Sequence, residues 1–240
     1  MNKRCWFPNL LTSINLFCGF MAITFVVHGM ETGPAGAEWF RWAALTICLS
    51  ALCDVLDGRL ARALHVSSPF GKELDSLSDI VSFGVAPALL VYEGFFRDTT
   101  QANPSFSFLW MTIAGLFVCC GAARLARYNV SGSSGSWFTG MPIPAGGLTI
   151  AGLAMFPARL NAALMAAIVL FAAFLMISTL RFPKLERLVF ESPLPVRLTL
   201  FAFFVIALID PASWFFLLPI SYMAYGLGDN LLNALRPKEA

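Results

Sequence analysis

Residues 54–79 read DVLDGRLARALHVSSPFGKELDSLSD and place four aspartates at Asp54, Asp57, Asp75 and Asp79. The first pair is three residues apart and the second pair is four, so each pair lies on one face of a helix. A short connection between the pairs predicts an antiparallel helical hairpin that brings all four carboxylates to the same depth. Apolar sequence surrounds them, and carboxylates inside apolar helices are costly and usually functional. The stretch therefore predicts a helical fold with an acidic functional site.

The composition excludes several classes of protein. Of the 240 residues, 58% are hydrophobic and 12% are charged, whereas roughly 25% are charged in ordinary globular proteins. An ordinary soluble enzyme is therefore excluded. A net charge of +2, with lysines and arginines standing singly or in pairs, argues against a nucleic-acid partner. The six cysteines form no C-x-x-C pair, so no zinc site is expected.

The apolar segments predict the fold class. A helix that crosses a bilayer needs about 20 apolar residues. Runs of this kind lie near residues 8–29, 38–60, 72–96, 105–124, 142–158, 161–180, 196–210 and 212–229. We therefore expect an all-α integral membrane protein with about eight transmembrane helices. Pro211 separates the last two runs so tightly that they can instead form a re-entrant hairpin.

The distribution of positive charge predicts the orientation. With eight spans, 13 of the 16 lysines and arginines fall on one side of the membrane and only Arg41, Arg97 and Arg159 fall on the other. Because short cytoplasmic loops accumulate Lys and Arg, the first side is expected to be cytoplasmic. Both termini and the acidic site are therefore expected on that side, in a multi-pass protein of the cell membrane.

The acidic cluster predicts a site for divalent cations. Four carboxylates within a few ångströms of one another cannot all stay ionised unless cations neutralise them. Oxygen ligands select hard ions, with Mg²⁺ or Mn²⁺ expected and Ca²⁺ as an alternative. A cation-coupled transporter is a further alternative, because carriers also use intramembrane aspartates. The cluster lies at a helix end, beside Arg59 and Arg62, and not near the middle of the bilayer as is typical of carriers. Paired metals and an arginine next to small residues favour a pyrophosphate ligand instead.

The spacing also carries a family resemblance. The pattern D-x2-D-G-x2-A-R-x8-G-x3-D-x3-D is matched by Asp54, Asp57, Gly58, Ala61, Arg62, Gly71, Asp75 and Asp79. It resembles the signature of the CDP-alcohol phosphotransferase family. The resemblance implies a membrane enzyme that cleaves the pyrophosphate of a CDP-linked alcohol, releases CMP and joins the remaining phosphate to a second alcohol. It implies a six-helix catalytic core over residues 1–182, followed by a C-terminal transmembrane hairpin over residues 183–240.

Four further segments narrow the expected substrate. Residues 8–19, 82–87, 124–129 and 140–145 resemble the serine-accepting members of this family. The substrates implied are CDP-diacylglycerol and L-serine. Glycerol 3-phosphate, inositol phosphate and choline remain alternative acceptors. The C-terminal hairpin can also pack against a second copy, so a homodimer stays open.

The resemblance assigns roles to individual residues. It implies that Asp54, Asp57, Asp75 and Asp79 bind two metal ions, and that Asp79 also acts as the general base. The expected contacts of CDP-diacylglycerol are Asn9, Thr12, Gly58, Ala61, Arg62, Ser68 and Gly71. The expected contacts of serine are Arg124, Arg127 and Asn129. The small residues can instead be packing contacts between membrane helices, and the two arginines can instead be anchors that obey the positive-inside rule.

Overall fold

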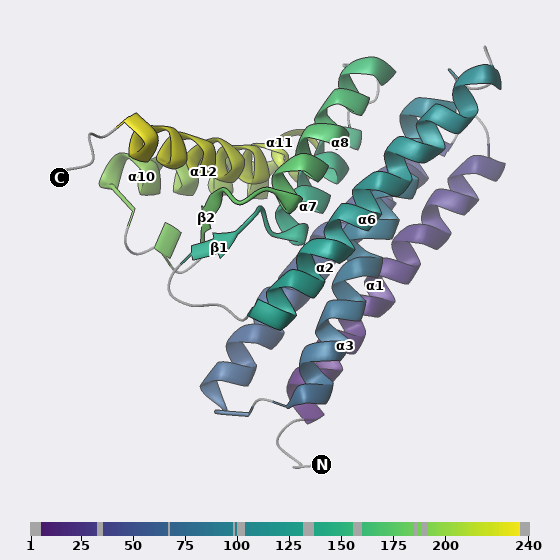
Figure 1. Ribbon diagram of the computed structural model, residues 1–240. Helices are drawn as coiled ribbons and strands as arrows, with labels where there is room; N and C mark the ends of the chain where they lie inside the picture. Colours follow the sequence, from purple (N-terminus) through teal and green to yellow (C-terminus); the bar gives the residue numbers. More distant parts are fainter. Residues whose placement is uncertain are drawn as a thin grey trace.

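The computed structural model describes residues 6–32, 36–66, 68–97, 99, 104–131, 137–155, 160–184, 187–188 and 192–235. The chain is mostly helical (Figure 1). The helices are α1 (Trp6–Glu31), α2 (Gly36–Ala63), α3 (Pro69–Asp79), α4 (Ala86–Val91), α6 (Ser107–Ser131), α7 (Ile143–Ala154), α8 (Ala162–Ile177), α10 (Leu194–Ile209), α11 (Pro211–Trp214) and α12 (Leu217–Leu235). A short 3₁₀ turn, η5 (Pro104–Phe106), precedes α6. Each predicted apolar run is therefore helical over most of its described length.

The helices form two groups. In Figure 1 the axes of the long helices α1, α2, α3 and α6 are roughly aligned, whereas α10 and α12 lie together across them. Small residues allow the long helices to approach closely. Ala22 of α1 and the pair Ala43 and Ala44 of α2 are fully buried. A Cβ at Gly19 of α1 would collide with Ser82, so this glycine sets the close approach of α1 to the helix that follows α3.

The helix that carries Asp75 and Asp79 changes its geometry directly after them. Residues Pro69–Phe96 form one apolar helix, in which α3 is followed by a π-helical segment η3 (Ile80–Val85), by α4 and by a second π-helical segment η4 (Tyr92–Phe96). Pro87 has no N–H to donate to the Phe83 carbonyl, so the α-helical ladder is interrupted at this point. A Cβ at Gly147 would lie 2.5 Å from that carbonyl oxygen. The glycine therefore lets α7 pack directly against η3.

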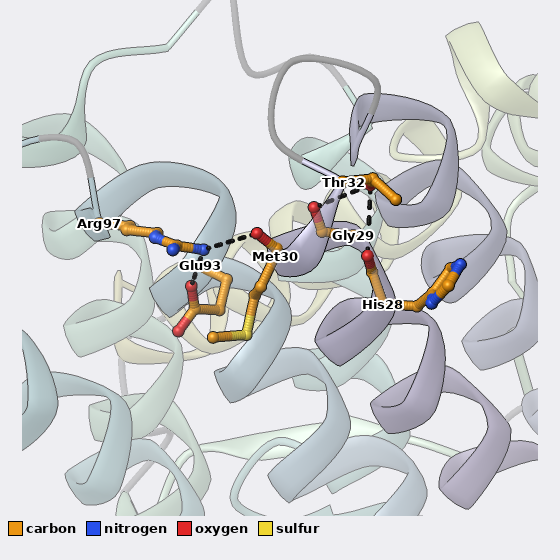
Figure 2. A network of polar contacts seen from close by, with 6 residues as sticks. All are labelled: His28, Gly29, Met30, Thr32, Glu93 and Arg97. Atoms are coloured by element: carbon orange, nitrogen blue, oxygen red, sulfur yellow. Dashed lines mark hydrogen bonds and ion pairs between the residues drawn. The ribbon is translucent and has the colours of Figure 1, made fainter.

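Polar contacts close the far end of α1 (Figure 2). Arg97 donates hydrogen bonds of 3.4 Å to the Met30 carbonyl and to the buried carboxylate of Glu93. The Thr32 hydroxyl donates to the carbonyls of His28 and Gly29 at 3.2 Å. These contacts satisfy carbonyls that the end of a helix leaves without a donor, so the end of α1 that is remote from the aspartates is fixed in place.

Two short strands depart from the all-α expectation. β1 (Trp137–Thr139) and β2 (Arg181–Pro183) pair antiparallel, with Phe138 opposite Phe182. Helix α12 holds β2: the Asn230 amide donates to the Arg181 carbonyl at 2.7 Å and accepts from the Arg181 N–H at 3.0 Å. The predicted boundary between residues 182 and 183 falls inside β2.

Four of the described helices are long and apolar enough to cross a membrane: Trp6–Glu31, Gly36–Ala63, Pro69–Phe96 and Pro104–Ser131. Helices α7 and α8 have 12 and 16 residues, which span about 18 and 24 Å at 1.5 Å per residue. The hydrocarbon core of a bilayer is about 30 Å thick. The mostly helical fold fits a membrane protein, while the count of eight spans stays a prediction.

Candidate functional site

Three of the four signature aspartates meet between α2 and α3. Carboxylate oxygens of Asp54, Asp57 and Asp75 all lie within 4.8 Å of one another. The Asp57 side chain is buried, and Oδ1 of Asp75 is buried without a hydrogen-bond partner. A buried oxygen without a donor is costly unless something else satisfies it. The predicted hairpin therefore brings these carboxylates together, and it leaves one buried oxygen of Asp75 without a hydrogen-bond donor.

This group fits a divalent cation. The donors are carboxylate oxygens only, which Mg²⁺, Mn²⁺ and Ca²⁺ prefer. Two oxygens bound to one Mg²⁺ at about 2.1 Å can be at most about 4.2 Å apart. A separation within 4.8 Å therefore needs only small side-chain rotations to close around an ion, and the ion would satisfy Oδ1 of Asp75. The cluster can hold a divalent metal.

Asp79 lies outside that group of three and is held by α1. It is almost fully buried, and its Oδ1 accepts a hydrogen bond of 3.4 Å from the Asn15 amide. The Ser50 hydroxyl in turn donates to Oδ1 of Asn15 at 2.9 Å. The Asn15 amide therefore orients the Asp79 carboxylate through one of its two oxygens. Sequence reasoning did not assign Asn15 or Ser50 to the site, although a polar residue in the middle of an apolar helix was a signal for Asn15.

A first cavity of about 210 Å³ opens beside Asp57 and Asp75. Six of the seven residues predicted to contact CDP-diacylglycerol line it: Asn9, Thr12, Gly58, Ala61, Ser68 and Gly71. The Thr12 hydroxyl donates a hydrogen bond of 2.7 Å to Oδ2 of Asp57, so it positions this carboxylate. The structure thus gathers residues from α1, α2 and α3 around one space.

The two signature glycines lie in different surroundings. A Cβ at Gly71 would lie 2.9 Å from Oδ1 of Asn9 and 3.1 Å from Oγ of Ser68, and Ser68 also caps α3 by accepting the Gly71 N–H at 3.0 Å. A Cβ at Gly58 would have one neighbour within 4 Å, a guanidinium nitrogen of Arg62 at 3.9 Å. Gly71 is therefore a packing glycine as well as a cavity residue, whereas Gly58 borders open space. Arg62 is exposed and does not line the cavity.

A second cavity of about 180 Å³ shares Asp75 with the first. Asp54, Asp79, Arg124 and Asn129 line it. The Arg124 side chain is buried, and its guanidinium carbon lies 5.2 Å from the ring centres of both Tyr128 and Phe138. Its Nε has no hydrogen-bond partner. A buried guanidinium with an unused donor, packed against two rings, can receive an anionic group.

Arg127 has a different environment from Arg124. Its guanidinium donates hydrogen bonds of 2.9 to 3.1 Å to four carbonyls, those of Thr139, Met176, Ile177 and Ser178. Gly140, with a positive φ of 77°, makes room for this side chain, because a Cβ there would lie 2.5 Å from Nη2 of Arg127. Arg127 lines neither cavity. Its predicted contact with serine stays a prediction, and its geometry favours a structural role that joins α6 to β1 and to the end of α8.

Lys72 lies beside the aspartates, and the sequence reasoning assigned it no role in the site. It lines both cavities, as does Asp75. Its Nζ donates a hydrogen bond of 3.2 Å to the Asn129 carbonyl, and the Asn129 amide donates to Oγ of Ser76 at 2.8 Å. The sequence identified Lys72 only as one of many positive charges near a helix end.

Known proteins resemble this chain over most of its length. Residues 5–178 match the family described as CDP-alcohol phosphatidyltransferase. The CDP-diacylglycerol–serine O-phosphatidyltransferase of Methanocaldococcus jannaschii is 38% identical over 182 residues, which cover 75% of this chain and 80% of the relative. The enzyme of the same name from Helicobacter pylori strain 26695 is 30% identical over 209 residues, covering 84% and 81%. The archaetidylserine synthase of Methanothermobacter thermautotrophicus is 35% identical over 186 residues, covering 75% and 70%.

The match covers more than half of the chain and includes the whole aspartate signature. It confirms the resemblance that the spacing of the signature carries. The chain belongs to the CDP-alcohol phosphatidyltransferase family.

Proposed function

We propose that this membrane protein is a phosphatidylserine synthase, which transfers the phosphatidyl group of CDP-diacylglycerol to L-serine and releases CMP. The observation that carries the proposal is the pair of cavities that adjoin at Asp75. One is lined by the signature residues expected to contact the nucleotide, and the other contains the buried Arg124. Relatives named as CDP-diacylglycerol–serine O-phosphatidyltransferases support serine as the acceptor.

The first cavity is assigned to the CDP moiety. Gly58 and Ala61 present no bulky side chain to it, so a pyrimidine ring has room beside α2. Asn9 and Ser68 offer hydrogen-bonding groups at the mouth, and Arg62, one turn beyond Gly58, is assigned to the pyrophosphate. The diacylglycerol chains need no pocket of their own if the site opens sideways into the bilayer.

The second cavity is assigned to serine. The Arg124 guanidinium would bind the serine carboxylate, because an arginine fork matches the two oxygens of a carboxylate. The cavity is lined by Asp54 and Asp79 as well, so the serine ammonium has negative charge opposite it. The side chain of Asn129 is placed to orient the amino acid at the mouth.

Asp54, Asp57 and Asp75 are assigned to divalent metal binding, with Asp79 as a further ligand of a two-ion site filled by Mg²⁺ or Mn²⁺. When bound, such ions polarise the phosphoryl group and stabilise charge on the attacking and leaving oxygens. Oδ2 of Asp79 would accept the proton of the serine hydroxyl, since Oδ1 is occupied by Asn15. The serine oxygen then forms a bond to the phosphorus that carries diacylglycerol, and the bond from this phosphorus to the CMP oxygen breaks. CMP leaves with the electron pair.

The site is assigned to the cytoplasmic side. Arg59, Arg62 and Lys72 lie at the same end of the helices as the aspartates, whereas Arg41 and Arg97 lie at the opposite end. This separation supports the orientation expected from the positive-inside rule. Outside the described residues lie Lys3, Arg4, Arg159, Arg236 and Lys238, so the cytoplasmic position of the termini remains a prediction. The division into a core and a C-terminal hairpin, and a homodimer, remain predictions as well.

Purified protein incubated with CDP-diacylglycerol and one alcohol at a time tests the proposal. We expect CMP release with L-serine, and little with glycerol 3-phosphate, inositol phosphate or choline. CMP release with another acceptor alone would move the chain to a different branch of the family. Absence of CMP with every acceptor, together with cation-driven uptake of a solute into vesicles, would favour the transporter alternative.

A further inference from the structure

Lys72 occupies the border between the two cavities. It stands in the first turn of α3, is exposed, and lines both spaces. Among the described residues that line the first cavity, it is the one that carries a positive charge, beside the carboxylates of Asp57 and Asp75. The other cation of the second cavity, Arg124, is buried at 5% exposure. The two positive charges are thus placed differently: Arg124 is enclosed, and Lys72 stands where the cavities meet.

The transferred phosphate must lie at this same border. If CDP occupies the first cavity and serine the second, the phosphate attached to diacylglycerol is bonded to CMP before the reaction and to serine after it. It therefore faces the first cavity as substrate and the second as product. A lysine has a flexible four-carbon stem and a compact charge with three donors, so it can follow a phosphate across such a border.

We infer that the Lys72 ammonium binds the phosphate of CDP-diacylglycerol that is transferred to serine. The inference rests on the proposed function and adds to it a substrate-binding residue outside the aspartate signature. The hydrogen bond from Nζ to the Asn129 carbonyl, 3.2 Å long, holds the ammonium at the mouth. Since an ammonium has three donors, this bond leaves others for phosphate oxygens.

A purely structural role is the competing explanation. In that case Lys72 would serve only to join α3 to the end of α6 through Asn129. The two roles differ in their dependence on the second phosphate of the nucleotide: CDP has a phosphate at the position of the transferred group, and CMP lacks it. A tether would affect the two nucleotides equally, whereas a phosphate contact would affect CDP alone.

The test measures dissociation constants of CDP and CMP for the full chain in detergent with Mg²⁺, by isothermal titration calorimetry. A hydrogen bond to a charged group contributes enough for about a tenfold or greater change in affinity. We expect Lys72→Met to weaken CDP binding by about tenfold or more and to leave CMP binding unchanged. Lys72→Gln should weaken CDP binding as Lys72→Met does, because neither side chain carries a charge. The glutamine amide can still donate to the Asn129 carbonyl, so this variant removes the charge and keeps a donor for the contact with α6. Lys72→Arg should retain most of the CDP affinity.

Arg59→Met is the matched control, because Arg59 is an exposed cation at the same helix end that lines neither cavity. It should leave both dissociation constants unchanged. Equal weakening of CDP and CMP by Lys72→Gln, or no weakening of either, would overturn the inference, as would a wild-type chain that does not prefer CDP to CMP. Failure of the proposed function is separate: it would appear as a wild-type enzyme that releases no CMP with serine.

Discussion

Replacing Gly58 by alanine is expected to stabilise the protein and to weaken nucleotide binding. A Cβ at this position would meet only a guanidinium nitrogen of Arg62, at 3.9 Å, so the protein itself has room for the methyl group. Alanine is favoured over glycine inside a helix by about 1 kcal/mol. For a chain of this size, that gain corresponds to a rise of about 2–4 °C in the thermal midpoint.

The same methyl group would occupy the space assigned to CDP. The cavity is only about 210 Å³, and forcing an extra methyl or methylene group into a filled site costs about 1–3 kcal/mol. This cost corresponds to a loss of about fivefold to more than a hundredfold in affinity. The midpoint is measured by thermal unfolding in detergent, and the CMP dissociation constant by calorimetry on the same preparation.

Gly115→Ala is the matched control for this variant. Gly115 lies inside α6, a Cβ there would meet nothing within 4 Å, and the residue lines neither cavity. It should give a comparable rise in midpoint with unchanged CMP affinity. If Gly58→Ala binds CMP as tightly as the wild type, the first cavity is not the nucleotide site. If the thermal midpoint of Gly58→Ala falls, the conclusion that the protein has room for a methyl group at this position is wrong.

Further perturbations test the rest of the site. Asp75→Asn should lower CMP release by at least about a hundredfold, because metal binding loses a shared ligand. EDTA should abolish turnover until Mg²⁺ or Mn²⁺ is restored. Full activity in either case would contradict metal dependence. Arg124→Ala should raise the serine KM about tenfold to a hundredfold and leave the KM of CDP-diacylglycerol unchanged. Arg127→Ala should instead lower the thermal midpoint. The reverse result would exchange the roles of the two arginines. Asn15→Leu should reduce kcat by about tenfold with KM values unchanged, because Asp79 loses its orienting donor; an unchanged kcat would remove Asn15 from the mechanism.

Much of the site could be predicted because it depends on local spacing. Helical periodicity alone places Asp54 and Asp57 on one face, and a short connection brings Asp75 beside them. Apolar runs likewise locate the helices, since length and composition decide whether a segment can cross a membrane. These features need no knowledge of how distant segments pack.

The remaining features depend on tertiary contacts that spacing does not encode. Arg124 and Arg127 are equivalent in sequence, three residues apart at the end of one helix. The structure separates them because Arg127 donates to carbonyls of β1 and α8, whereas Arg124 packs against two neighbouring aromatic rings. The pairing of β1 with β2 joins segments more than 40 residues apart, and strands of three residues carry almost no periodic signal.

We assign nucleotide and serine to two separate cavities that meet at Asp75. An experimental structure of the protein with CDP, Mn²⁺ and L-serine tests this assignment most directly, with anomalous scattering used to locate manganese. We expect manganese among Asp54, Asp57 and Asp75, cytidine beside Gly58 and the serine carboxylate on Arg124. Manganese outside the aspartate cluster, or CDP and serine in the same cavity, would contradict it.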